Sequence, residues 1–338
     1  MKVVFLLFAA TLQLSVSTST LAFEESEMQV RNRIQSAVTK AFLMKDYDLL
    51  EKLAQEYRST KDRTPSGLWK LTLFYSGIQG AVALDTRKDP AKFGAVEDIA
   101  SGWVAKYPKS PAALIVKSSV YLSHGAAIRG SGYANTVKAE AWTSFYEYVT
   151  LARLNLEVHK TTAHVDPQWY EQMIAIARLE GWSQNQFKSL FVEGTAREPL
   201  YYQTYFSALE YLLPKWGGST SEIEKFAVEA TKNTSVSEGV GMYARIYWYA
   251  SQTQFKDDIF GNSKVDWLVM KKGFDDVLSK YPDAWNLVNF TKFACLAKDG
   301  KKANELLGRI EKERIAPGWA TAELIQKCQI LADLHKTK

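Results

Sequence analysis

Apolar residues recur at helical spacing along most of the chain, and the pattern is clearest in residues 197–254. A first apolar face extends over residues 199–213 at intervals of three and four, which predicts an amphipathic helix with Pro199 in its first turn. Ser219 then caps a second predicted helix, and a third covers residues 236–250. The repeating unit is therefore a pair of helices joined by a tight turn.

The same spacing predicts helices along the rest of the chain, with little sign of strands. They cover residues 24–44, 48–58, 65–78, 89–106, 110–128, 136–159, 168–179, 184–195, 265–280, 284–298, 300–311 and 320–336. No linker rich in proline, glycine or serine divides them. We therefore predict an all-α fold, a superhelix (solenoid) of degenerate tetratricopeptide-like helical hairpins, in which residues 23–338 form a single domain.

Proline marks several of the predicted helix starts. Lys-Tyr-Pro occurs at residues 106–108 and again at 280–282, each time between two predicted helices. Pro167 and Pro199 lie 32 residues apart, close to the 34-residue tetratricopeptide period, whereas the other proline intervals do not match it. The repeats have therefore diverged.

Residues 1–22 have the pattern of a secretory signal peptide. Lys2 precedes an apolar segment at residues 3–10, and the small-x-small sequence at residues 20–22 offers a cleavage site. No later segment has the roughly 20 apolar residues that a membrane-spanning helix needs. We therefore expect an exported protein, periplasmic or secreted, without a membrane span.

The composition excludes some classes of partner. Hydrophobic residues make up 46% of the chain and charged residues 23%, and the formal net charge is +5. Removal of Lys2 with the leader leaves +4, which affects solubility more than the choice of partner. No cluster of Lys and Arg with interleaved aromatic residues is present, so nucleic acid is not an expected partner. The 10 Trp, 17 Tyr and 16 Phe are spread along the chain, as in packing between helices.

No motif for a metal or a cofactor is present. The four histidines are scattered, and the chain contains no HExxH, P-loop, dinucleotide fingerprint or G-x-S-x-G. Paired carboxylates remain as the only enzymatic alternative, because helical toroids that hydrolyse sugars place two acids across a cleft. The acids to examine for such a carbohydrate-active (α/α) hydrolase are Glu140, Asp166, Glu171 and Glu238. An acid near a helix start is more often a cap.

Three short strings are more specific than plain packing requires: residues 129–134, 212–219 and 238–248. Residues 66–71 form a fourth string that precedes them. With these strings the chain resembles a bacterial family described as a domain of unknown function, over about residues 46–254. Members of that family are similar to tetratricopeptide proteins in build, and many are exported. The resemblance implies a helical fold and no particular activity.

Six residues in or beside these strings are the candidates for ligand binding: Arg129, Tyr133, Trp142, Trp216, Tyr243 and Arg245. Each has a structural interpretation, since an arginine can stack on aromatic rings and Trp216 can plug the end of a hairpin. Gly239 and Gly241, placed inside a predicted helix, would allow a neighbouring helix to approach. In the functional interpretation, Arg129 and Arg245 lie on the inner face of the superhelix and hold a carboxylate from a peptide end or an acidic side chain.

The only two cysteines, Cys295 and Cys328, lie on predicted helices separated by one other helix. In a stack of hairpins such helices can be neighbours, and export places the thiols where they oxidise. A disulfide is therefore one outcome, and two separate buried thiols are the other.

The likeliest function from sequence is the binding of a protein or peptide partner through the concave face, with no catalysis evident. Two carboxylates facing each other in a deep aromatic cleft would favour the hydrolase, whereas a groove lined by arginine, tyrosine and asparagine would favour the binding protein.

Overall fold

The computed structural model describes residues 25–86, 89–312 and 326–331, and these residues are helical apart from connecting turns. Among them no strand is present, so the predicted all-α class is confirmed. The predicted signal peptide at residues 1–22 and most of the predicted last helix lie outside the described residues, although residues 326–331 are helical. The α-helices in chain order are α1 (Glu27–Leu43), α2 (Tyr47–Thr60), α3 (Lys70–Thr86), α4 (Phe93–Lys106), α5 (Pro111–Arg129), α6 (Ala139–Val158), α7 (Lys160–Ala163), α8 (Gln168–Leu179), α9 (Gln184–Arg197), α10 (Tyr202–Tyr211), α11 (Thr220–Glu238), α12 (Gly241–Ala250), α13 (Ile259–Asn262), α14 (Trp267–Lys280), α15 (Ala284–Leu296) and α16 (Gly300–Lys312).

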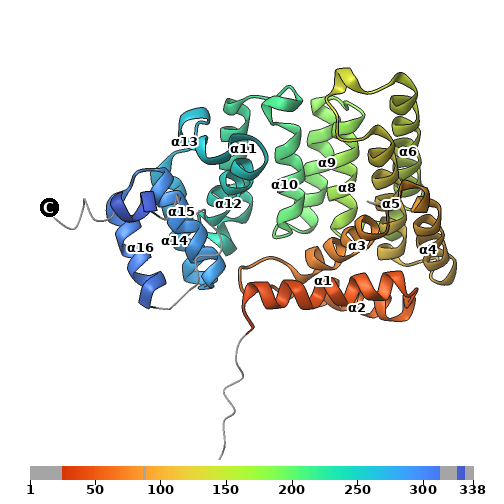
Figure 1. Ribbon diagram of the computed structural model, residues 1–338, viewed down its shortest axis with the longest axis horizontal. Helices are drawn as coiled ribbons and strands as arrows, with labels where there is room; N and C mark the ends of the chain where they lie inside the picture. The colour runs from red at the N-terminus through yellow and green to blue at the C-terminus, as the bar shows by residue number, and fades with distance from the viewer. Residues whose placement is uncertain (1–24, 87–88, 313–325, 332–338) are drawn as a thin grey trace, which may run out of the picture.

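Helices that follow one another in the chain pack against one another. α4 contacts α5, α5 contacts α6, α8 contacts α9, α11 contacts α12, and α14 contacts α15. In Figure 1, α6, α8, α9 and α10 stand upright, and α1 and α2 lie across their lower ends. The buried side chains form one continuous cluster that extends from Val30 to Cys328.

Side-chain caps set many of the helix starts. Ser26 and Ser183 each form a capping box with a glutamine three residues later, so two backbone donors are satisfied at each start. Ser110 caps α5, and Pro111 occupies the first turn, where a missing N–H costs nothing. The predicted cap at Ser219 is confirmed, whereas the first helix starts at Glu27 and not at residue 24.

Residues that precede proline end three helices with one backbone geometry. Tyr107, Glu198 and Tyr281 have φ of −129°, −134° and −131°, and ψ of 70°, 77° and 75°. Each is followed by proline, which disfavours the α conformation in the residue before it. The repeated Lys-Tyr-Pro is thus a repeated helix stop.

Two predicted boundaries in residues 197–254 are wrong. α10 begins at Tyr202 and not at Pro199, because Tyr201 is extended and its buried hydroxyl donates to Gln168 Oε1 at 2.6 Å. α11 continues to Glu238, so the next helix starts at Gly241 and not near Val236.

Gly239 separates these two helices and does not lie inside one. Its φ is +56°, a left-handed conformation that favours glycine. A Cβ there would lie 2.5 Å from Asp276 Oδ2, and one on Gly241 would lie 3.0 Å from Val277. The close approach predicted for these glycines is therefore present, and α14 is the neighbour.

The segment that joins α2 to α3 forms hydrogen bonds with α1, α12 and α15. Ser66 N donates to Glu27 Oε2 at 2.8 Å, and Ser66 O accepts from Arg245 Nη2 at 2.8 Å and from Asn286 Nδ2 at 3.2 Å. Nearby, Asp166 accepts from Arg58 and Tyr75. Helices α1 to α3 are thus bonded to the turn before α8, to α12 and to α15.

A disulfide joins Cys295 on α15 to Cys328, with the two Cα atoms 5.3 Å apart. It closes a loop with a sequence separation of 33 residues. The helical residues 326–331 are thereby held against α15.

Candidate ligand-binding groove

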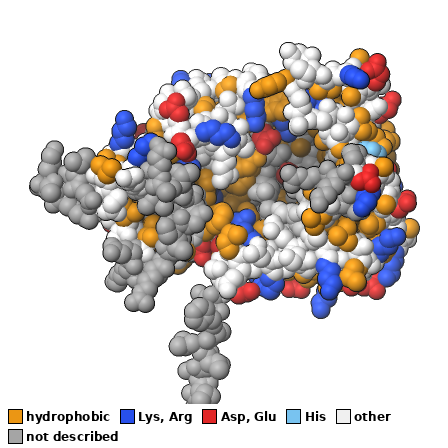
Figure 2. Space-filling view, viewed as in Figure 1, with side chains coloured by type: hydrophobic (Ala, Val, Ile, Leu, Met, Phe, Trp, Pro, Cys, Tyr) orange, Lys and Arg blue, Asp and Glu red, His pale blue; other side chains and the backbone are white. Residues whose placement is uncertain are grey.

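A groove with two connected lobes lies where α1, α10, α12 and α15 meet. We call the larger lobe, of about 480 Å³, the outer lobe and the smaller lobe, of about 210 Å³, the inner lobe; both are lined by Trp248, Gln252 and Trp285. The space-filling view is hollowed near the middle, and hydrophobic side chains are visible in the hollow (Figure 2). The two volumes together fall in the range of ligand-binding clefts.

The inner lobe is aromatic and positively charged. Its lining residues are Arg31, Ser66, Leu68, Gln203, Phe206, Arg245, Trp248, Tyr249, Gln252 and Trp285. They include two arginines and no carboxylate. Arg31 is paired with Glu27, so the uncompensated positive charge between these aromatic walls belongs to Arg245 and favours an anion.

Arg245 is the most unusual member of the inner lobe. Its side chain is only 7% exposed, and Nη2 donates to Ser66 O at 2.8 Å. Nε has no hydrogen-bond partner, and no carboxylate among the described residues forms an ion pair with this guanidinium. Its Cζ lies 4.8 Å from the ring centre of Tyr202 and 5.6 Å from that of Tyr281. Ring contacts compensate in part for burial of a charge, but an anion would compensate more.

A second arginine, Arg63, lies over the ring of Tyr202. Arg63 Cζ is 4.9 Å from the ring centre of Tyr202, and its guanidinium donates to the carbonyl oxygens of Gly67 and Leu200. In the described part of the chain Arg63 also has no ion-pair partner. Burial raises the pKa of the Tyr202 hydroxyl well above its ordinary value, so the ring is neutral. Two arginines thus lie on the ring of Tyr202, and neither has an ion-pair partner among the described residues.

The aromatic wall continues into an irregular turn. Trp248 lies in the last turn of α12, and residues 251–255 form a π-helical turn that carries Gln252 into the groove. Lys256 follows with φ +55° and ψ −138°, a conformation rare for a residue other than glycine. π-helical turns of this kind are frequent at functional sites.

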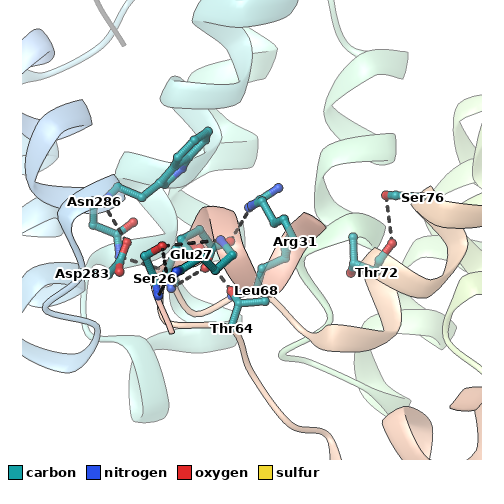
Figure 3. Close-up of polar contacts among 12 residues, drawn as sticks. Ser26, Glu27, Arg31, Thr64, Leu68, Thr72, Ser76, Asp283 and Asn286 are labelled. Atoms are coloured by element: carbon teal, nitrogen blue, oxygen red, sulfur yellow. Dashed lines mark hydrogen bonds and ion pairs between the residues drawn. The ribbon is translucent and has the colours of Figure 1, made fainter. Parts of the chain in front are cut away.

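The outer lobe contains the acids of the groove. Glu27 is 1% exposed, and its carboxylate accepts from Arg31 Nε at 2.6 Å and from Ser66 N at 2.8 Å. Asp283 caps α15 by accepting from Trp285 N at 2.8 Å, and burial, with the charge of Glu27 among the lesser causes, raises the pKa of its carboxyl. Figure 3 shows Glu27 beside Arg31 and Asp283, next to the loop that carries Thr64 and Leu68. Both acids therefore already serve as structural contacts.

The structure places the two predicted arginines apart. Arg129 ends α5, donates to the carbonyl oxygens of Gly130 and Gly132, and lies 4.9 Å from the ring centre of Trp142. Tyr133, in the next turn, is 85% exposed. None of these three residues lines the groove, whereas Arg245 does.

The other two candidates also lie outside the groove. Trp216 is half-exposed and stacks with Arg178, whose Cζ is 4.5 Å from its ring centre. Tyr243 is buried, donates to Glu224 Oε2 at 2.9 Å and accepts from Asp266 N at 3.0 Å. Their described contacts are structural.

The four candidate acids do not meet in a cleft. Asp166 is fully buried against Arg58 and Tyr75, and Glu238 is buried against Lys280 and Tyr281. Glu140 is exposed in the first turn of α6, and Glu171 accepts from Gln168 Nε2. None of them lines either lobe.

Sequence reasoning missed most of the groove. Trp248 is the last residue of the string at residues 238–248, but it is not among the six candidate residues. Trp285, Gln252 and Arg31 lie in no recognisable sequence motif. Trp285 follows the second Lys-Tyr-Pro by three residues, which is the one signal that the sequence offered.

Comparison with protein-family models, curated proteins and solved structures finds no match to this chain. In the described ranges, no helix combines the length and the apolar character needed to cross a membrane. The same residues contain no group of three or more His, Cys, Asp and Glu arranged to hold a metal ion.

Proposed function

We propose that this chain is an exported protein of diverged tetratricopeptide-like hairpins that binds a protein or peptide partner in the two-lobed groove. Packing of neighbouring helices in chain order and the shared geometry at Tyr107, Glu198 and Tyr281 support a stack of related hairpins. The leader-like pattern of residues 1–22 supports export.

One observation carries the binding function: Arg245 is buried at the wall of an aromatic cavity without an anionic partner. Buried charges in proteins are normally paired, because removal of an ion from water costs several kcal/mol. A ligand with an acidic group would supply the missing partner. Trp248, Trp285 and Phe206 would bury its apolar portion.

The hydrolase alternative has less support. Glu27 and Asp283 are the two carboxylates of the groove, and each accepts a hydrogen bond from a backbone N–H, that of Ser66 and that of Trp285 respectively. Glu27 is in addition paired with Arg31. A glycosidase needs one carboxylic acid that can give its proton to the leaving group and a second carboxylate facing it across the substrate.

Photo-crosslinking tests the proposed function. A benzophenone side chain would replace Met28, which is half-exposed in the outer lobe, and in a control protein it would replace Val236, which is exposed on α11 outside both lobes. We expect a discrete polypeptide adduct from position 28 in the native envelope fraction, and its loss when Trp285→Ala is added. Equal adducts from both positions, or none from position 28, would refute binding of a polypeptide in the groove.

A further inference from the structure

If the groove binds a polypeptide as proposed, we infer that the inner lobe receives the C-terminal residue of the partner, and that Arg245 binds its α-carboxylate. The ligand class is thus a peptide with a free carboxyl end and an apolar last side chain. This assignment rests on the proposed function and adds the direction in which the partner's chain enters the groove.

The distribution of charge gives this direction. Of the two arginines of the inner lobe, Arg31 is paired with Glu27 and Arg245 has no ion-pair partner among the described residues, whereas the carboxylates of Glu27 and Asp283 line the outer lobe with Lys292. Lys292 is itself paired with Asp257 at 2.7 Å. A peptide whose negative end lies in the inner lobe is therefore favoured over the reverse direction.

The shape of the inner lobe fits a chain end. Ser66 and Arg245 form part of its wall and are only 3% and 7% exposed. Its volume of about 210 Å³ is less than half that of the outer lobe, at about 480 Å³. A single residue fits such a space, and the preceding residues would lie in the outer lobe.

The polar groups of the inner lobe are suited to a carboxylate and its peptide bond. Arg245 donates to Ser66 from Nη2 and its Nε is buried away from solvent, so Nη1 is the nitrogen left for an anion. Gln203 and Gln252 line the same lobe, and their side-chain amides have no hydrogen-bond partner among the described residues. Two glutamine amides beside an arginine can hold a terminal peptide group, while Phe206 and Trp248 pack on the last side chain.

Labelled peptides distinguish a terminal carboxylate from an acidic side chain. Three pools of N-terminally dye-labelled hexapeptides would be compared by fluorescence anisotropy with the purified protein. The first pool ends in Leu or Phe with a free carboxylate, the second is its C-terminal amide, and the third is an amide that ends in Glu. We expect the free-acid pool to bind at least about tenfold more tightly than either amide pool.

A pair of variants assigns the effect to the inner lobe. Arg245→Lys keeps the charge but loses the planar fork, so the preference for the free acid should fall by about tenfold. Arg129→Lys is the matched control, since Arg129 also lies over an aromatic ring, that of Trp142, but outside the groove, and the preference should stay unchanged. The comparison of acid with amide uses unmodified protein and holds even if Arg245→Lys unfolds.

The outcomes separate this inference from the proposed function. Equal affinity of the acid and amide pools, or a preference for the pool ending in Glu, overturns the terminal-carboxylate assignment and leaves polypeptide binding in place. Failure of all three pools to bind, with the adduct at position 28 still formed, also overturns it. Failure of the pools together with loss of the adduct overturns both.

Discussion

Buried polar side chains in this protein find their partners far along the chain. Glu27 binds the backbone of Ser66, and Asp166 binds Arg58 and Tyr75 from two earlier helices. Arg245 differs, because its one hydrogen bond leaves a buried charge without an acid. A buried charge that the fold leaves unpaired is more informative about function than a partly exposed one such as Arg129.

Glu171 gives a pH-dependent prediction at this scale. Burial, together with the nearby carboxylate of Glu210, raises the pKa of Glu171 from about 4.5 to about 7. Between these pH values the folded protein holds a proton that the unfolded chain releases. The stability from this group is therefore fully present below about pH 4.5 and lost as the pH rises to about 7.

Glu171→Gln should remove that loss and raise the free energy of unfolding at pH 8 by roughly 2 kcal/mol. Urea unfolding at pH 4.5 and pH 8 measures it. Glu140→Gln, at an exposed position in the first turn of α6, controls for the substitution itself. An equal effect of Glu171→Gln at both pH values would show that the carboxyl is not protonated in the folded protein.

Helix ends, at the scale of elements, are predictable where one residue decides them. The start of α5 is set by Ser110 and Pro111, which are adjacent to it in sequence. The ends of α4, α9 and α14 are each set by a residue that precedes proline. The start of α10 and the break at Gly239 were missed, because each depends on a partner in another helix. Asp276 on α14 accepts from Val240 N at 2.8 Å, and no pattern near residue 240 reveals that bond.

Gly239→Ala tests why α11 ends where it does. The substitution adds strain at φ +56° and a Cβ 2.5 Å from Asp276 Oδ2, so we expect a loss of about 2 to 3 kcal/mol in unfolding free energy. Gly181→Ala is the control, since Gly181 has φ +67° and open space around it, and should cost about 1 kcal/mol. Thermal unfolding of both variants gives the comparison. Equal losses would show that Asp276 moves aside without cost.

At the scale of the whole molecule, local periodicity predicted the fold class but not the groove. The inner lobe forms where Ser66 meets Arg245 and Asn286, which are 179 and 220 residues away in sequence. Apolar spacing at three and four residues identifies helices one by one and carries no information about contacts at such separations. Arg245 lies in an unusual string, which makes it a candidate from sequence, whereas the sequence around Trp285 is that of an ordinary helix start.

The disulfide gives the last prediction, and it concerns the C-terminal end as a whole. Cys295 and Cys328 close a loop with a separation of 33 residues, which restricts the unfolded chain and should stabilise the protein by about 3 to 4 kcal/mol. Urea unfolding with and without reductant measures this difference, and replacement of both cysteines by alanine gives the control on which reductant should have no effect. Thiol titration of the denatured, unreduced protein should find no free thiol; two would contradict the bridge. The helix α15 carries Val288, Asn289 and Lys292 of the outer lobe. We therefore expect reduction of the disulfide to weaken ligand binding as well. Unchanged binding after reduction would show that the packing of α15 on α14 and α16 holds the outer lobe without the bridge.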